Sequence, residues 1–313
     1  MKKRLIFIVA ALMLVLAACG NEDSTKEETT KNDDTETSKT TSDTITYQSE
    51  SGPIEVPANP QRVVVLSLYA GDLIQLGVNI VGADSWLKDN PNFAEGLANA
   101  EVIASDDYEK IIELDPDLII GSVDVEDAAK LQEIAPTVLF TYGAVGYLEQ
   151  HIEVAKVVNK EAEATAWVED FKVRSQAVGE EIKEKYGEDV TVTIAGNYDK
   201  QISLFGDNWG RGTEIIYQAM GLKMPQSVED VVLDPGYFTI SEEVFGDYIG
   251  DFLVLNVVRE GQDTTFLDSN WYNNIPAVKN GNVFYAEGPA FYYNDAYSLD
   301  YQLDFFKKSF LGN

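Results

Sequence analysis

The sequence contains one cysteine and one histidine among 313 residues, and 23 basic side chains against 53 acidic ones. These counts exclude a disulfide scaffold, a cysteine-rich cluster and a metal site built from several histidines. The formal net charge of −30 argues against nucleic acid as a partner, because nucleic-acid binding needs a basic surface. With 45% hydrophobic residues, the chain can still form one large or two medium hydrophobic cores.

The first residues have the pattern of a secretion signal. Three basic residues at positions 2–4 precede an apolar run, Leu5 to Ala18, that is shorter than the roughly 20 residues of a spanning helix. "LAAC" at its end resembles the lipobox of bacterial lipoproteins, which implies that Cys19 is lipidated and becomes the mature N-terminus. The alternative is an ordinary signal peptide with an unrelated cysteine. We expect a signal peptide at residues 1–18 and a lipid anchor at Cys19, on the extracytoplasmic face of the cell membrane.

Residues 21–44 contain no apolar side chain. Such a segment has nothing to bury, so we expect residues 19–44 to be a disordered tether. The following residues, 45–146, alternate β-branched runs with short amphipathic segments. Strands are expected at 62–67, 79–84, 117–122 and 137–142, and this alternation predicts a parallel sheet covered by helices.

Residues 147–187 differ in composition from the preceding segment, since they contain no proline and their only glycines are Gly179 and Gly187. Their apolar positions recur at spacings near three and four, which predicts one long helix or two helices in tandem. Residues 188–313 resume the β/α alternation and end in an amphipathic helix. We therefore expect an α/β protein in which two α/β lobes, each with a central and mainly parallel sheet, are joined by a long helical connector. Ligands of such sheets bind at the carboxyl ends of the strands, which points to a cleft between the lobes.

Several longer motifs occur in a specific order: "PQRVVVLS", "YEKIIELDPDLII", the connector, "FTISEEVFGDYIGDFLVL" and "WYNNIPAVKNGNVFY". In this order they resemble the class III substrate-binding lipoproteins of bacterial ABC importers for ferric siderophores, haem and cobalamin. "WGRG" before a helix, with "TY" ending the fourth strand, is similar to the ferric-hydroxamate binders of Gram-positive bacteria. The resemblance implies a monomeric receptor, not an enzyme, that delivers its ligand to an ABC permease with a cytoplasmic ATPase.

The scarcity of metal-ligating side chains is consistent with that resemblance. A siderophore supplies all the ligands of its iron, so the protein needs no cofactor and no metal site of its own. A tricatecholate complex carries about three negative charges and needs a basic pocket, whereas a trihydroxamate complex is nearly neutral. After the leader the arginines are Arg62, Arg174, Arg211 and Arg259. So few arginines favour a hydroxamate of the ferrichrome or ferrioxamine type, with catecholate, haem and cobalamin as alternatives.

The candidate ligand-binding residues are one arginine and several aromatic residues. Arg211 can donate to two hydroxamate oxygens, and Trp209 offers a flat apolar wall. Gly210 and Gly212 allow the backbone between them to turn tightly. For each side chain the alternative is a structural role. The further candidates are Tyr142 at the end of the fourth strand, Tyr292 or Tyr293 in the "GPAFYYND" loop, and Trp86.

Two acidic residues occupy matching places in the two lobes. Glu109 begins the helical turn before "LDPDLII", and Glu243, with Glu242 as its neighbour, lies in "ISEEVFGDY". The resemblance implies that one glutamate on each lobe docks onto arginines of the permease, while the alternative is a pair of solvated helix-start acids. Among the weaker candidates, we expect His151 on the surface of a helix, Trp167 in packing contacts, and no strong role for Trp271 or Tyr198.

Two functions from other classes remain as alternatives. One is a secreted α/β hydrolase, although the sequence lacks a G-x-S-x-G motif and its single histidine lies in the connector. The other is a surface lipoprotein that binds only proteins.

Overall fold

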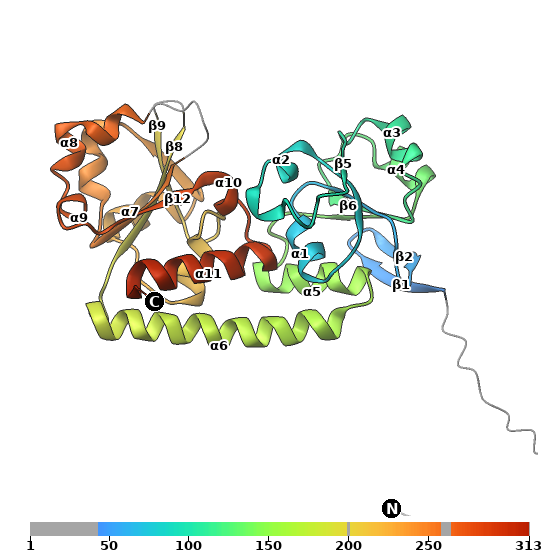
Figure 1. Cartoon of the computed structure of the whole chain (residues 1–313), viewed down its shortest axis with the longest axis horizontal. Coiled ribbons are helices and arrows are strands. Elements are labelled where there is room, and N and C mark those ends of the chain that lie inside the picture. The colour runs from blue at the N-terminus through green and yellow to red at the C-terminus, as the bar shows by residue number, and fades with distance from the viewer. Residues whose placement is uncertain (1–42, 199–200, 258–263, 313) are drawn as a thin grey trace, which may run out of the picture. The chain divides into compact units, whose positions relative to one another are not determined.

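Two five-stranded sheets flanked by helices form most of the computed structural model, which describes residues 43–198, 201–257 and 264–312 (Figure 1). The α/β fold with two lobes and a helical connector, expected from the sequence, is confirmed. Cys19, the rest of residues 1–42 and Arg259 lie outside the described residues. Among the described residues, no helix combines the length and the apolar character needed to cross a bilayer.

The N-terminal lobe contains an entirely parallel sheet with the strand order β5-β4-β3-β6-β7. Its central strands are fully buried, which explains their continuous apolar sequences. A hairpin that the sequence pattern did not predict, β1 (Thr44–Ser49) and β2 (Gly52–Pro57), precedes this sheet. The remaining elements are β3 (Val63–Leu66), α1 (Ala70–Gln75), β4 (Ile80–Ala83), α2 (Ser85–Lys88), η1 (Pro91–Phe93), β5 (Glu101–Val102), α3 (Tyr108–Glu113), β6 (Leu118–Ser122), α4 (Ala128–Ile134) and β7 (Thr137–Phe140).

The C-terminal lobe has the strand order β10-β9-β8-β11-β12, in which β8, β11 and β12 are parallel and β9 and β10 run antiparallel to their neighbours. Its elements are β8 (Val192–Tyr198), β9 (Gln201–Phe205), η2 (Glu214–Ala219), α7 (Gln226–Val232), β10 (Tyr237–Ile240), η3 (Glu242–Tyr248), β11 (Phe252–Val257), η4 (Thr265–Asp268), α8 (Asn270–Asn273), α9 (Pro276–Lys279), β12 (Val283–Glu287), α10 (Gly288–Phe291) and α11 (Ala296–Leu311). The helix expected after "WGRG" is the π-helical η2, because the N–H of Met220 bonds to the carbonyl of Ile215, five residues earlier.

The connector consists of two helices in tandem, α5 (Tyr147–Val157) and α6 (Glu161–Tyr186). Asn159, between them, has a left-handed φ of 57°. Helix α6 runs beneath both lobes and beside α11 in Figure 1. Its Ala164 belongs to the core of the N-terminal lobe and its Phe171 to that of the C-terminal lobe. One continuous helix therefore contributes to both cores.

Buried polar side chains connect the lobes where α1 meets α11. Asp72 Oδ1 lies 2.9 Å from His151 Nδ1 and accepts the N–H of Ala296 at 3.1 Å. Asp295 packs directly on α1, because a Cβ at Gly71 would lie 1.7 Å from its Oδ1. The prediction that His151 lies on the surface is wrong: it is 1% exposed. Pairing with Asp72 allows this polar ring to be buried.

A second polar group links the connector to the last helix. Asp300 on α11 accepts Trp167 Nε1 at 2.9 Å and Arg174 at 2.7 Å, both from α6. The Trp167 ring stacks on Phe171 at 4.9 Å. Arg174 is thus committed to contacts within the connector and the last helix.

Candidate ligand-binding site

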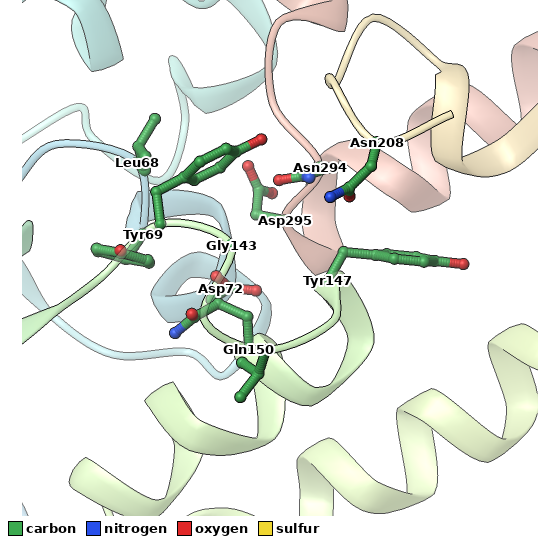
Figure 2. Close-up of a pocket in the computed structure, with 11 residues that line it drawn as sticks. Leu68, Tyr69, Asp72, Gly143, Tyr147, Gln150, Asn208, Asn294 and Asp295 are labelled. Atoms are coloured by element: carbon green, nitrogen blue, oxygen red, sulfur yellow. The ribbon is translucent and has the colours of Figure 1, made fainter. Parts of the chain in front are cut away.

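A narrow pocket with a cavity volume of about 30 Å³ lies where the two lobes meet. Figure 2 shows Leu68 and Tyr69 on one side and Asn208 and Asn294 on the other, with Asp72 and Asp295 between them. The pocket lies beyond the carboxyl ends of β3 and β7, as expected for a parallel sheet. Its lining residues are Leu68, Tyr69, Asp72, Tyr142, Gly143, Val145, Tyr147, Gln150, Asn208, Asn294 and Asp295.

The "WGRG" turn has three consecutive residues with positive φ: 65° at Gly210, 62° at Arg211 and 88° at Gly212. A Cβ at Gly210 would lie 2.3 Å from the carbonyl oxygen of Tyr292, and one at Gly212 would lie 2.7 Å from the ring of Phe306. Both glycines are therefore required by conformation and by close packing. Arg211 adopts the left-handed conformation at a steric cost, so contacts around it must hold it there.

The guanidinium of Arg211 lies between two aromatic rings. Its Cζ is 4.6 Å from the ring centroid of Phe205 and 5.3 Å from that of Tyr292, distances typical of cation–π contacts. One guanidinium nitrogen donates to the carbonyl of Trp209 at 2.8 Å. The amide of Asn256, at the end of β11, donates to the carbonyl of Arg211 at 3.4 Å. The ring contacts and the bond to Trp209 orient the guanidinium, and the bond from Asn256 holds the backbone of Arg211.

Trp209 is half-buried and forms an aromatic pair with Tyr237 on the edge strand β10. The ring centroids are 5.3 Å apart and the planes are inclined by 36°. Gly236 permits this contact, since a Cβ there would lie 2.6 Å from the indole. The backbone N–H of Trp209 donates to Thr213 Oγ1 at 3.0 Å. The indole is thus held as part of a wall that continues onto an exposed tyrosine.

Tyr142 lies just beyond β7 in an exposed loop, and its side chain is 46% exposed. The pKa of its hydroxyl is raised, chiefly by desolvation and then by the nearby Glu214. A hydrogen bond with Asn294 and the charge of Arg211 offset part of this rise. Asn294, Glu214 and Arg211 all belong to the C-terminal lobe. Tyr142 and Asn294 thus line the pocket from different lobes, while Arg211 lies outside the lining and acts on Tyr142 through its charge.

The two adjacent tyrosines of the "GPAFYYND" loop have different surroundings. Tyr293 is 8% exposed, belongs to the core of the N-terminal lobe and packs on Phe93 with ring centroids 5.4 Å apart. Tyr292 is partly exposed and lies beside Arg211. Of the two, Tyr292 is the side chain that shares a location with the other candidates.

The remaining candidates lie apart from this group. Trp86, on α2, is 59% exposed and does not line the pocket. Trp271 packs among aromatic residues of the C-terminal lobe, and the side chain of Tyr198, the last residue of β8, lies outside the described part of the chain. Glu109 and Glu243 are both exposed in the first turn of a short helix, α3 in one lobe and η3 in the other.

Most side chains that line the pocket were not singled out from the sequence, among them Asn208 and Asn294, and neither was the adjacent Glu214. Asn208 directly precedes Trp209, and Asn294 follows the two adjacent tyrosines, so proximity to the selected motifs was the available signal. Glu214 directly follows "GRGT", where it reads as an ordinary acid at the start of a helix. No group of three or more histidine, cysteine, aspartate or glutamate side chains in the described residues has an arrangement that could hold a metal ion.

A model of the family described as periplasmic binding protein matches residues 63–290. The chain belongs to this family. Among its members, the iron(3+)-hydroxamate-binding protein FhuD of Bacillus subtilis strain 168 is 35% identical over 309 residues, with 97% of this chain and 96% of that protein covered. The family resemblance drawn from the motifs is thereby confirmed.

Solved structures of the family agree with this assignment. FhuD2 from Staphylococcus aureus, determined with bound ferrioxamine B, matches with a TM-score of 0.75 and 34% identity over 81% of this chain and 99% of that one. A binding-protein component of a Fep/Fec-like ferrichrome ABC transporter from Bacillus subtilis matches with a TM-score of 0.76 and 36% identity, covering 84% of this chain and 98% of that one. The second of these is described as a periplasmic binding protein.

Proposed function

We propose that this protein is an extracytoplasmic receptor that binds a ferric hydroxamate siderophore between its lobes and delivers it to an ABC permease. The observation that carries this proposal is that Tyr142 from one lobe and Asn208 and Asn294 from the other line one pocket, with Arg211 close enough for its charge to act on Tyr142. A guanidinium can donate to hydroxamate oxygens while the aromatic side chains contact the apolar backbone of the chelate. The relatives named for hydroxamate binding support the same cargo.

The charges at the pocket favour a neutral or cationic complex over an anionic one. The lining residues include Asp72 and Asp295 but neither lysine nor arginine. A tricatecholate complex, with about three negative charges, would be repelled by the acidic Asp72 and would find no cationic cage among the lining residues to offset that repulsion. A hydroxamate complex of the ferrichrome or ferrioxamine type avoids that repulsion.

The binding role involves no covalent chemistry. His151 is the only histidine of the chain, and it is 1% exposed with its Nδ1 beside Asp72. Its Nε2 has no hydrogen-bond partner, so it does not activate a serine as a hydrolase would require. These features support a binding protein over a secreted hydrolase.

A fluorescence titration with a panel of iron complexes tests the cargo. Ferrioxamine B and ferrichrome should quench the tryptophan emission of the purified protein at submicromolar concentration. A tricatecholate complex, haem and cobalamin should bind far more weakly. Tight binding of one of these three, with none of the hydroxamates, would assign a different cargo to the same architecture.

Delivery to the permease is proposed to use Glu109 and Glu243. Their exposed positions at the start of a helix in each lobe make both carboxylates accessible to a partner. Charged groups at the rim of an interface steer association and orientation. Glu109→Ala and Glu243→Ala should each impair uptake by cells and leave siderophore binding in solution normal. Normal uptake by the double variant would remove the docking assignment.

Membrane attachment is proposed to occur through lipid on Cys19, with residues 21–44 as a tether. Cys19→Ser should release the protein from the membrane fraction. Deletion of residues 21–44 should leave affinity for the siderophore unchanged, because no apolar side chain is removed. A tenfold loss of affinity in the deletion variant would contradict the tether.

A further inference from the structure

Glu214 is a fully buried acid beside the candidate ligand-binding residues. Its side chain is 1% exposed and accepts three hydrogen bonds. Oε1 accepts the backbone N–H of Gly210 at 3.0 Å and the amide of Asn294 at 2.8 Å. Oε2 accepts the hydroxyl of Thr213 at 2.9 Å. A buried carboxylate with three donors is a costly feature that persists where those donors need to be held together.

The three donors belong to two separate segments of the C-terminal lobe. Gly210 and Thr213 belong to the turn that carries Trp209 and Arg211. Asn294 belongs to the segment that follows α10, 80 residues later, and that also carries Tyr292. One carboxylate thus connects the two segments that supply the candidate ligand contacts of this lobe.

The backbones of these two segments are also in direct contact. The N–H of Arg211 donates to the carbonyl of Phe291, and the α-carbon of Gly210 lies against the carbonyl of Tyr292. Arg211 makes this contact in the left-handed conformation, which an L-residue adopts only when its surroundings stabilise it. Glu214 supplies such stabilisation through its bond to the adjacent Gly210 N–H.

We propose that Glu214 is a positioning residue of the ligand site. Its buried carboxylate sets the spacing between the turn of Trp209 and Arg211 and the segment of Tyr292 and Asn294 before the ligand binds. This inference rests on the proposed function, because it assigns Glu214 to the binding of the same siderophore. It predicts that Glu214 affects affinity through Arg211 without contacting the ligand.

Variants at position 214 separate positioning from general stability. Glu214→Ala removes all three acceptors, and affinity for ferrioxamine B should fall about tenfold or more. Glu214→Gln retains an oxygen for Gly210 and Asn294, so its affinity should stay within about threefold of wild type. Thr213→Val removes one donor to Glu214 together with the acceptor of the Trp209 N–H, and it provides a milder variant if Glu214→Ala does not fold.

A double-mutant cycle provides a readout that a purely structural role would not change. In the wild type, Arg211→Ala should weaken binding by about tenfold to a hundredfold. In the Glu214→Ala background, or in Thr213→Val, the same change should cost markedly less, because Arg211 is already misplaced. If the two losses simply multiply, Glu214 does not act through Arg211 and the inference is overturned.

Thr193→Val is the matched control for loss of a buried polar contact in the same lobe. Thr193 is fully buried on β8, donates to the carbonyl of Tyr248 at 2.7 Å and accepts the N–H of Gly250 at 3.1 Å. The melting temperature of the Thr193→Val variant should fall, while its affinity for ferrioxamine B should stay unchanged. If the wild type binds neither ferrioxamine B nor ferrichrome, the proposed function fails and this inference fails with it. If the wild type binds and Glu214→Ala binds equally well, the inference alone fails.

Discussion

The two walls of the pocket are each held by a glutamate, but in different environments. On the C-terminal wall, Glu214 is buried and bonded to three donors of two segments. On the N-terminal wall, the loop that carries Tyr142 is held by Glu50, an exposed residue of the β1–β2 turn. Glu50 accepts the backbone N–H of Thr141 at 2.9 Å and its hydroxyl at 2.5 Å.

This difference indicates how the two walls meet a ligand. Breaking a buried hydrogen bond is costly because water cannot replace the lost partner, whereas water readily replaces the partner of an exposed bond. The C-terminal wall is therefore preorganised around Arg211, and the N-terminal wall can adjust the loop of Tyr142. Since α6 contributes to both cores, adjustment of this loop requires less rearrangement than rotation of one lobe against the other.

The largest effect is expected for the preorganised wall. Arg211→Ala should weaken ferrioxamine B binding by about tenfold to a hundredfold, because a charged donor is lost. Arg211→Lys should recover only part of the affinity, since an ammonium lacks the planar fork. Titration of each variant should be paired with its thermal melt without ligand. Wild-type affinity in Arg211→Ala would make the arginine a structural residue.

The second effect is a dependence of stability on pH, and it arises from Asp295, which lies between the two walls of the pocket. Burial and the nearby Asp72 raise the pKa of Asp295 to about 8. Between the unfolded pKa of about 3.9 and this value, the folded protein holds a proton that the unfolded chain has lost. Stability should therefore fall as pH rises through this window.

Asp295→Asn should remove that dependence and keep the N-cap of α11, since an amide oxygen can still accept the N–H of Ser298. The difference in unfolding free energy between Asp295→Asn and the wild type should shift in favour of the variant by at least about 1 kcal/mol from pH 5 to pH 8.5. Denaturant unfolding at the two pH values measures it. Parallel pH profiles for the two proteins would show that Asp295 is ionised throughout.

A smaller loss of affinity is expected on the adjustable wall. Tyr142→Ala should weaken ferrioxamine B binding by about threefold to tenfold, because its half-exposed ring can bury only part of its area on the ligand. Tyr142→Phe isolates the contribution of the hydroxyl that bonds to Asn294. A loss equal to that of Arg211→Ala would mean that both walls are equally preorganised.

The smallest effect is expected for the exposed glutamate. Glu50→Ala should change affinity by no more than about twofold, since water can replace its bonds to Thr141. The affinity of Glu50→Ala for ferrioxamine B should be compared with that of Glu214→Ala, measured in the same titration. A tenfold loss in Glu50→Ala would remove the distinction between the two walls.

Part of the candidate site was accessible from the sequence because single residues carried the signal, although of the residues that line the pocket only Tyr142 was selected in this way. Glycines on both sides of Arg211 indicated a tight turn, and both have positive φ. The choice between Tyr292 and Tyr293 could not be made in the same way. Both lie in a loop without periodicity, and their different burial depends on Phe93, which lies far away in the sequence.

The sequence by itself determined the family, the two α/β lobes and the helical connector. These follow from local properties that each segment carries alone, namely hydrophobic periodicity, glycine and proline positions, and motif order. Only the tertiary structure decided that His151 is buried beside Asp72, 79 residues away, and that Glu214 meets Asn294, 80 residues away. A buried polar side chain depends on the partner that packing brings within hydrogen-bond distance, and no local pattern specifies that partner.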